Sequence, residues 1–172
     1  MADQFALWIR TRLTTRDFEA LKDVLREAGY SLTHPAYGTG IVLDDEGGQI
    51  QTPEDEIAER VTGDSELVTF EWWLNSDEDI VCSAGPVPGH DQLQELWFYL
   101  DGVDQDVRVG VADALLGSVR AKPELTRALV VDYRGSTIEF DWRSYLLDGG
   151  QAPTVQPDVL IAPTTAEDLP GD

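Results

Sequence analysis

Two adjacent tryptophans, Trp72 and Trp73, lie in a run of strand-forming residues at 65–74 (SELVTFEWWL). Adjacent side chains of a β-strand point to opposite faces of the sheet. Both faces of the sheet must therefore be covered here, or one face must offer a large aromatic ring to a partner. Trp8 also requires a cover on the second face, because in the first strand it lies on the face opposite to the apolar residues Phe5, Leu7 and Ile9. Helices on one face, with the C-terminal tail or a second subunit on the other, would meet this condition.

Hydrophobic periodicity divides the chain into strands, with a period of two residues, and helices, with a period near 3.6. Thr14 and Asp17 have the spacing of an N-terminal capping box, and Gly29 is placed to end that helix. A second helix is expected to have Thr52 as N-cap and Pro53 in its first turn. The expected strands are 4–13, 65–74, 80–84, 93–100, 128–133 and 137–142, the last two forming a hairpin; a loose hairpin falls within 40–51, and the expected helices are 15–28, 53–62 and 105–121.

This order of elements predicts an α+β fold, in which an antiparallel sheet carries two main helices packed on one face, plus a short third helix. Residues 1–149 are expected to form a single α+β domain. Residues 150–172 contain four prolines, four acids and no Arg or Lys. We expect them to form a Pro-rich acidic tail that is mostly extended, with an apolar island at 159–162 that docks on the body or on another subunit.

The charge of the chain is concentrated in its middle. The formal net charge is −21, and the 81 residues between Arg26 and Arg108 hold 19 Asp and Glu but only one basic side chain, Arg60. Such a field repels nucleic acid and acidic membranes and attracts cations or basic protein surfaces. We therefore expect no direct nucleic-acid binding and no membrane association.

The sequence contains no motif that fixes a chemistry. Cys82 and His90 offer a thiol and a base, but Cys82 falls in an apolar run and is expected to be buried. One cysteine and two histidines predict no transition-metal site, and no cofactor motif is found. The acids at 44–46 and 77–79 supply oxygen ligands without the spacing of an EF-hand. A small metal-dependent or carboxylate-based hydrolase is kept as an alternative, because any two of the acids can meet in a cleft.

The N-terminus, MADQFALWIR, lacks the basic region and apolar run of a signal peptide. No apolar run approaches the roughly 20 residues that a membrane-spanning helix needs. The sequence therefore predicts a cytoplasmic protein.

These observations lead to the hypothesis of a non-enzymatic acidic interaction protein that binds a basic protein surface. A toxin-neutralising immunity protein, an inhibitor of a nucleic-acid-binding enzyme, or a nucleic-acid mimic would each use such a surface. The main alternative is a salt-adapted or structural protein, with a homo-oligomer left open, whose charge serves solubility. The candidate partner-binding residues are Asp44, Asp45, Glu46, Glu54, Asp55, Glu56, Glu59, Asp77, Glu78, Asp79, Asp101, Asp104, Asp106, Trp72 and Trp73.

Overall fold

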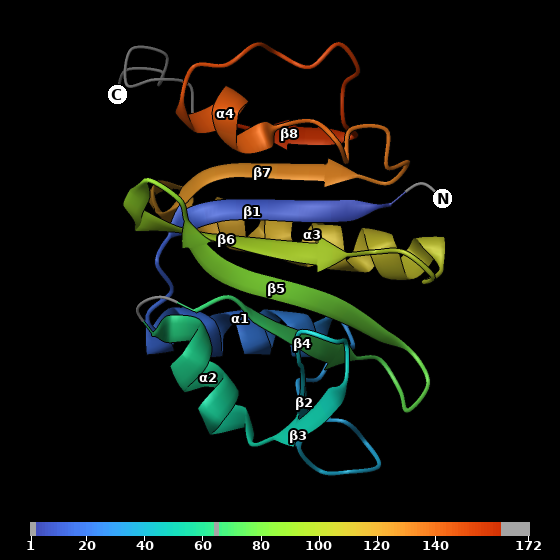
Figure 1. Cartoon of the computed structure of the whole chain (residues 1–172). Coiled ribbons are helices and arrows are strands. Elements are labelled where there is room, and N and C mark those ends of the chain that lie inside the picture. Colours follow the sequence, from blue (N-terminus) through green and yellow to red (C-terminus); the bar gives the residue numbers. More distant parts are fainter. Residues whose placement is uncertain (1–2, 64–65, 163–172) are drawn as a thin grey trace.

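One antiparallel sheet of eight strands organises the chain (Figure 1). The computed structural model describes residues 3–63 and 66–162. The strands are β1 (Phe5–Thr11), β2 (Gly40–Leu43), β3 (Gln49–Thr52), β4 (Val68–Trp73), β5 (Asp79–Val87), β6 (His90–Tyr99), β7 (Thr126–Asp132) and β8 (Val159–Ile161). The helices are α1 (Thr15–Glu27), α2 (Glu54–Thr62), α3 (Gln105–Ala121) and α4 (Trp142–Leu147), with a 3-10 turn at Pro123–Leu125. The predicted α+β class and antiparallel sheet are confirmed.

The strand order is β3-β2-β4-β5-β6-β1-β7-β8. Its middle holds a β-α-β-β-α-β unit, formed by β1, α1, β5, β6, α3 and β7, in which β1 lies between β6 and β7. This arrangement is the split β-α-β pattern called ferredoxin-like. The segment from β2 to β4 is inserted between α1 and β5 and widens the sheet on one side, whereas β8 widens it on the other.

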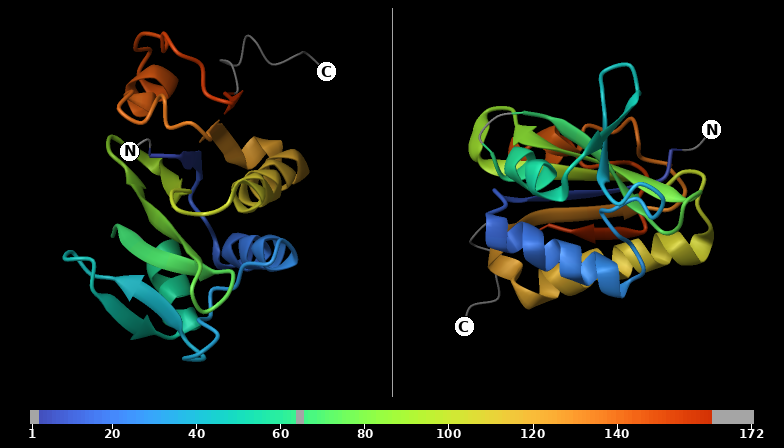
Figure 2. Two further views of the ribbon diagram at one scale, coloured as in Figure 1. Left: turned by 90° about the vertical axis from the view of Figure 1, so that its right-hand side faces the viewer. Right: turned by 90° about the horizontal axis from the view of Figure 1, so that it is seen from below.

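The main core lies between the sheet and helices α1, α2 and α3. Figure 2, left, shows α1 and α3 side by side on this face of the sheet. Even-numbered residues of β1 point to this face, so Trp8 is 2% exposed and its indole Nε1 donates to Thr126 Oγ1 at 3.0 Å. Phe18 of α1 packs against Phe70 and Trp72 of β4. Burying these rings supplies much of the driving force for folding.

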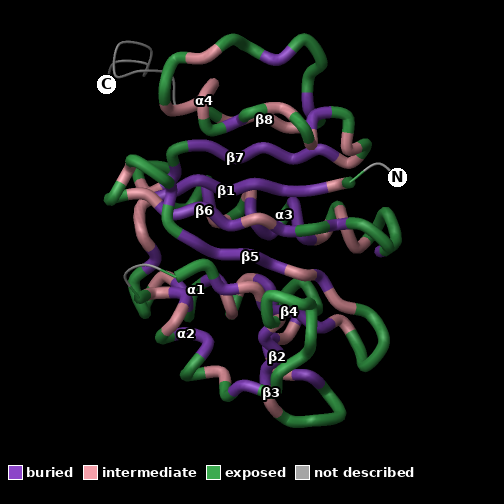
Figure 3. Tube along the Cα trace, in the orientation of Figure 1, coloured by how far each residue is buried: buried purple, intermediate pink, exposed green. Residues whose placement is uncertain are grey.

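The opposite face of the sheet carries a second, smaller apolar cluster around β1 and β7. Phe5, Leu7 and Ile9 are fully buried there, beneath α4 and the chain that leads to it. Trp142 at the start of α4 is 2% exposed and packs edge-on against Phe140. Figure 3 shows that β1 and β7 are buried along most of their length, whereas the β2–β3 turn is exposed. Residues 138–147, which directly precede the expected tail, therefore cover part of the second face, and Leu160 of the tail packs against the same cluster.

The first helix begins and ends where the sequence indicates. Thr14 and Asp17 form both hydrogen bonds of the capping box, which satisfies main-chain donors that the first turn leaves open. Gly29 has a φ of +99°, a conformation that side chains with a Cβ rarely adopt, and the chain turns there into Tyr30. The second helix differs by one residue, because Pro53 is its N-cap and makes no side-chain cap bond.

The hairpin predicted from 128–133 and 137–142 is wrong in its second half. The carboxylate of Asp132 accepts hydrogen bonds from the Arg134 amide and from both the amide and hydroxyl of Thr137. These bonds satisfy the donors within a compact turn, so the chain continues into α4 instead of a strand. Val159–Ile161 pairs with β7 in place of that strand. Residues 163–172 of the expected tail lie outside the described residues.

No helix within 3–63 and 66–162 combines the length and hydropathy needed to cross a bilayer.

Candidate functional site

Two of the acidic groups lie at the same end of the sheet. The β4–β5 turn, which carries Asp77 and Glu78, connects Trp73 to its paired residue Asp79. The β6–α3 loop begins after Tyr99, which pairs with Val81 near the start of β5. The two connections therefore leave neighbouring strands side by side, as Figure 1 shows at the right. We call Asp77, Glu78, Asp101, Asp104 and Asp106 the acidic end; all five are exposed.

Local hydrogen bonds fix the shape of the acidic end. The Asn75 side-chain oxygen accepts from the amides of Asp77 and Glu78, which sets the turn and leaves both carboxylates in solvent. Asp101 accepts from the Gln4 amide at 2.9 Å. The Tyr30 hydroxyl donates to the Val107 carbonyl of α3; burial raises the pKa of Tyr30 to about 12, with a smaller contribution from the charge of Glu78.

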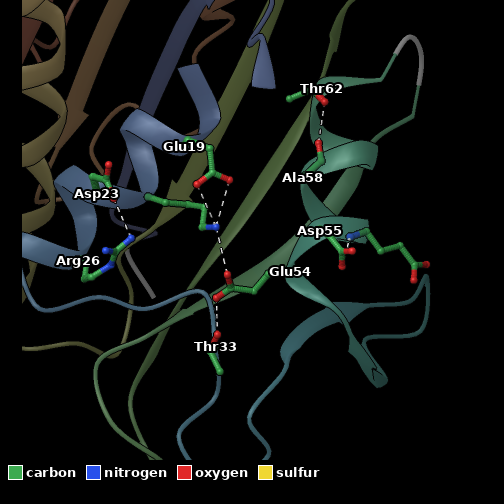
Figure 4. A network of polar contacts seen from close by, with 10 residues as sticks. Glu19, Asp23, Arg26, Thr33, Glu54, Asp55, Ala58 and Thr62 are labelled. Carbon is green, nitrogen blue, oxygen red and sulfur yellow. Dashed lines mark hydrogen bonds and ion pairs between the residues drawn. The ribbon is translucent and has the colours of Figure 1, made fainter. Parts of the chain in front are cut away.

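The acids of α2 have two different environments. Glu54 bonds to the Thr33 hydroxyl and lies 3.1 Å from Lys22 Nζ, which also contacts Glu19 (Figure 4). Burial alone would raise the pKa of Glu54, but these partners lower it below its usual value. Glu54 therefore joins α2 to α1, and it is not free to bind a partner. The remaining acids of this helix, Asp55, Glu56 and Glu59, are exposed.

The acids at 44–46 lie at the tip of the β2–β3 hairpin, which projects from the body (Figure 2, right). Asp44 accepts from the amides of Glu46 and Gly48, so it caps the turn. Asp45 and Glu46 are exposed. The predicted site residues thus do not form one patch: two groups meet at the acidic end, while the hairpin tip and the first turn of α2 flank strand β3.

Most of these carboxylates have no cation beside them. Within the part of the chain that the structure describes, several ion pairs involve acids outside the predicted site, among them Asp17, Asp23 and Glu95. Of the predicted site residues in that part, only Glu54 has such a partner within 4.0 Å. The exposed acids therefore project an uncompensated negative field, which water and salt screen over about 10 Å.

Asp79 differs from the other predicted acids because it is half-buried and lies beside a second carboxyl group, Glu71. Glu71 is 4% exposed and accepts from the Gln49 side chain at 3.1 and 3.2 Å. Burial raises the pKa of Glu71, and the charge of Asp79 adds to that rise; burial also raises the pKa of Asp79. Sequence reasoning missed Glu71, because its position in an apolar strand gives no sign of a neighbouring carboxyl group.

Glu95 gives Glu71 a matched counterpart on the same face of the sheet. It is also 4% exposed, but it accepts two hydrogen bonds from the Arg143 guanidinium, one of them at 2.7 Å. This face of the sheet thus carries two buried carboxylates: Glu95 is paired with a cation, whereas Glu71 lies beside another acid.

Replacing Glu71 by Gln is expected to raise the free energy of unfolding at pH 7, whereas Glu95→Gln should lower it by about 1–3 kcal/mol. A raised pKa means that the folded state binds the proton more tightly than the unfolded state. Ionised Glu71 therefore costs stability as the pH rises from the usual value through the raised one. Urea unfolding at pH 7 and pH 4 checks this: the gain from Glu71→Gln should shrink at pH 4. Equal destabilisation by both substitutions would contradict the assignment.

Trp72 and Trp73 point to opposite faces, as expected, but both are buried. Trp72 is 1% exposed on the helix side and Trp73 is 6% exposed on the other side, where it meets the His34 ring at 4.2 Å between centroids. Neither ring is available as a surface anchor. The exposed aromatic rings are those of Tyr37 and Tyr99, which the sequence did not single out.

The only cysteine is not placed for catalysis. Cys82 is buried in the main core, and burial raises the pKa of its thiol far above the usual range. His90 lies instead 3.1 Å from Asp148. Among the described residues, no group of three or more His, Cys, Asp or Glu side chains is arranged to hold a metal ion.

Comparisons with known proteins add no assignment: no protein-family model, no curated protein and no solved structure matches this chain.

Proposed function

We propose that the protein binds a basic protein surface through its exposed carboxylates. The observation that carries this proposal is that the acidic end, the hairpin tip and the exposed acids of α2 lie together in groups without a cationic partner within 4.0 Å in the described chain, whereas several acids elsewhere, such as Asp17 and Glu95, have one. Like charges held together cost free energy unless a partner or salt offsets them.

A basic partner would relieve this repulsion on binding. Long-range attraction would speed the encounter, and direct carboxylate–guanidinium or carboxylate–ammonium contacts would then select the partner. The hydrogen-bonded turn around Asn75 favours this role, because it fixes the main chain of Asp77 and Glu78 and presents both carboxylates to solvent. An immunity protein or an inhibitor of a nucleic-acid-binding enzyme is the kind of protein that needs such a surface.

The test compares two variants with the same change in net charge. The site variant carries Asp77→Asn, Glu78→Gln and Asp104→Asn. The control variant carries Asp113→Asn, Glu124→Gln and Glu139→Gln, three exposed acids outside the proposed surface. Wild type and both variants serve as baits in an extract of the native host, and association with each purified captured protein is then followed at two ionic strengths.

We expect a basic protein whose association with the site variant is about tenfold slower than with wild type at low salt, with a weaker salt dependence. The control variant should associate at nearly the wild-type rate. Equal slowing of both variants would show that only net charge matters, and would favour the salt-adapted alternative. If no basic protein is captured by wild type, the proposal fails.

A further inference from the structure

Strand β3 is an edge strand whose outer side is open. Within the described chain, β3 pairs only with β2 and ends the strand order of the sheet. Gln49, Ile50 and Gln51 are all exposed. An edge of this kind presents main-chain donors and acceptors to which another strand can add.

The hydrogen-bond pattern identifies which main-chain groups face outward. The Asp44 amide donates to the Gly48 carbonyl at 2.9 Å, and Val42 pairs with Ile50. Because inward and outward groups alternate along an antiparallel ladder, the amide and carbonyl of Ile50 face β2. Those of Gln49 and Gln51 therefore face solvent.

The side chains of β3 present two different faces. Gln49 reaches Glu71 on the face away from the main helices. Ile50 lies opposite Val42, a residue of the main core, and therefore points to the helix side, yet it is 50% exposed. The apolar layer thus continues to the edge of the sheet and stops at a side chain that a ninth strand would cover.

Acidic residues flank this edge at both ends. Asp44, Asp45 and Glu46 precede β3, and Asp55 and Glu56 follow it, with no Arg or Lys between 44 and 56. A second copy of β3 would bring like charges together, which disfavours edge-to-edge pairing of two copies. A strand with basic residues at its ends would meet opposite charge at each end.

We propose that β3 binds an extended basic segment of a partner protein as a ninth strand. The segment would hydrogen-bond to Gln49 and Gln51, place an apolar side chain against Ile50, and set Arg or Lys near the hairpin tip and the first turn of α2. This inference rests on the proposed function and adds the mode of binding.

The test measures amide hydrogen exchange in the 15N-labelled full chain by NMR. The peptide RTVTVTR, acetylated and amidated at its ends, supplies an extended basic segment. RTVPVTR has the same charge but contains a proline, which removes a ladder donor, and ETVTVTE reverses the charge. At saturating RTVTVTR, exchange of the Gln49 and Gln51 amides should slow at least tenfold, while the Ile50 amide, which already faces β2, should change less.

Gln51→Pro removes one outward amide and should weaken RTVTVTR binding at least tenfold. Since this variant can misfold, Asp44→Asn with Asp45→Asn and Glu46→Gln provides a second one, with Asp101→Asn, Asp104→Asn and Asp106→Asn as its charge-matched control. Only the first of these triple variants should weaken binding. Preservation of the amide spectrum away from β3 checks folding in every case.

Equal affinity for RTVTVTR and RTVPVTR, without slowed exchange at Gln49 and Gln51, would overturn strand addition. Slowed exchange with ETVTVTE would overturn the requirement for a basic segment, and slowed exchange that grows with protein concentration in the absence of peptide would overturn the partner by identifying a second copy as the occupant. These results leave the association test of the acidic end unaffected. A basic partner that binds the acidic end while β3 stays unprotected would refute strand addition alone.

Discussion

Replacing Trp72 by Ala is expected to lower the free energy of unfolding by about 3–5 kcal/mol, the range for removing a large aromatic side chain from a packed core. Trp72 is 1% exposed, and its ring centroid lies 5.7 Å from that of Phe70 and 6.3 Å from that of Phe18. It therefore joins β4 to α1. Because a small domain has a net stability of about 5–15 kcal/mol, the loss is large enough to populate the unfolded state.

Urea unfolding, followed by circular dichroism and compared with wild type, measures this loss. Tyr99→Ala is the control, because Tyr99 is 38% exposed, and its substitution should cost much less. A loss below about 1 kcal/mol for Trp72→Ala would contradict the packing described, since most core truncations cost more. Weaker partner binding by Trp72→Ala should follow only from the loss of folded protein.

Asp132→Asn is expected to lower the free energy of unfolding at pH 7 by about 2–3 kcal/mol, the range for hydrogen bonds to a charged group. Asp132 is fully buried, and one of its oxygens accepts from both the amide and the hydroxyl of Thr137 at 2.8 and 2.7 Å. An amide side chain keeps the shape, but it cannot accept at both ends. If the NH2 group of the new Asn faces Thr137, the amide and hydroxyl of Thr137 both lose their acceptor. If it faces Arg134 instead, the Arg134 amide loses its acceptor.

The loss should depend on pH in a defined direction. Burial raises the pKa of Asp132, but the bonds from Thr137 and Arg134 lower it by more, so the net value is below the usual one. The carboxylate therefore contributes stability above about pH 3.9, the usual value for Asp, and loses it as the pH falls through the lowered pKa. Unfolding of wild type and Asp132→Asn at pH 7 and at pH 3 or below should show the difference shrinking. Asp113→Asn, an exposed control, should show little difference at either pH.

The elements with a strong period were predictable from the sequence, and the turn after β7 was not. The alternation in β1 and the capping box of Thr14 and Asp17 are local patterns, so they specify a strand and a helix start without knowledge of the rest. Residues 137–142 also alternate, but the Asp132 carboxylate accepts hydrogen bonds from the amide and the hydroxyl of Thr137, the first residue of this segment. A side chain outside the pattern thus decided the structure of the segment.

The candidate site was predictable as a list of charges and not as an arrangement. The sequence identifies the acids, and turn chemistry places many of them in solvent. It does not reveal that Glu54 forms an ion pair with Lys22, because this contact joins residues 32 positions apart. Nor does it place Asp79 beside Glu71, which depends on the register between β4 and β5. The edge position of β3 likewise follows from the strand order.

The position of β1 between β6 and β7 has a consequence for protein synthesis. Phe5 pairs with Tyr99 and with Asp132, so β1 cannot complete its pairing until residue 132 has emerged from the ribosome. At 5–20 residues per second, roughly 6–25 s pass between the synthesis of β1 and that of the end of β7, which completes its pairing. The acids of the middle segment emerge during this interval. Their mutual repulsion would keep nascent chains on one messenger apart while the centre of the sheet is still incomplete.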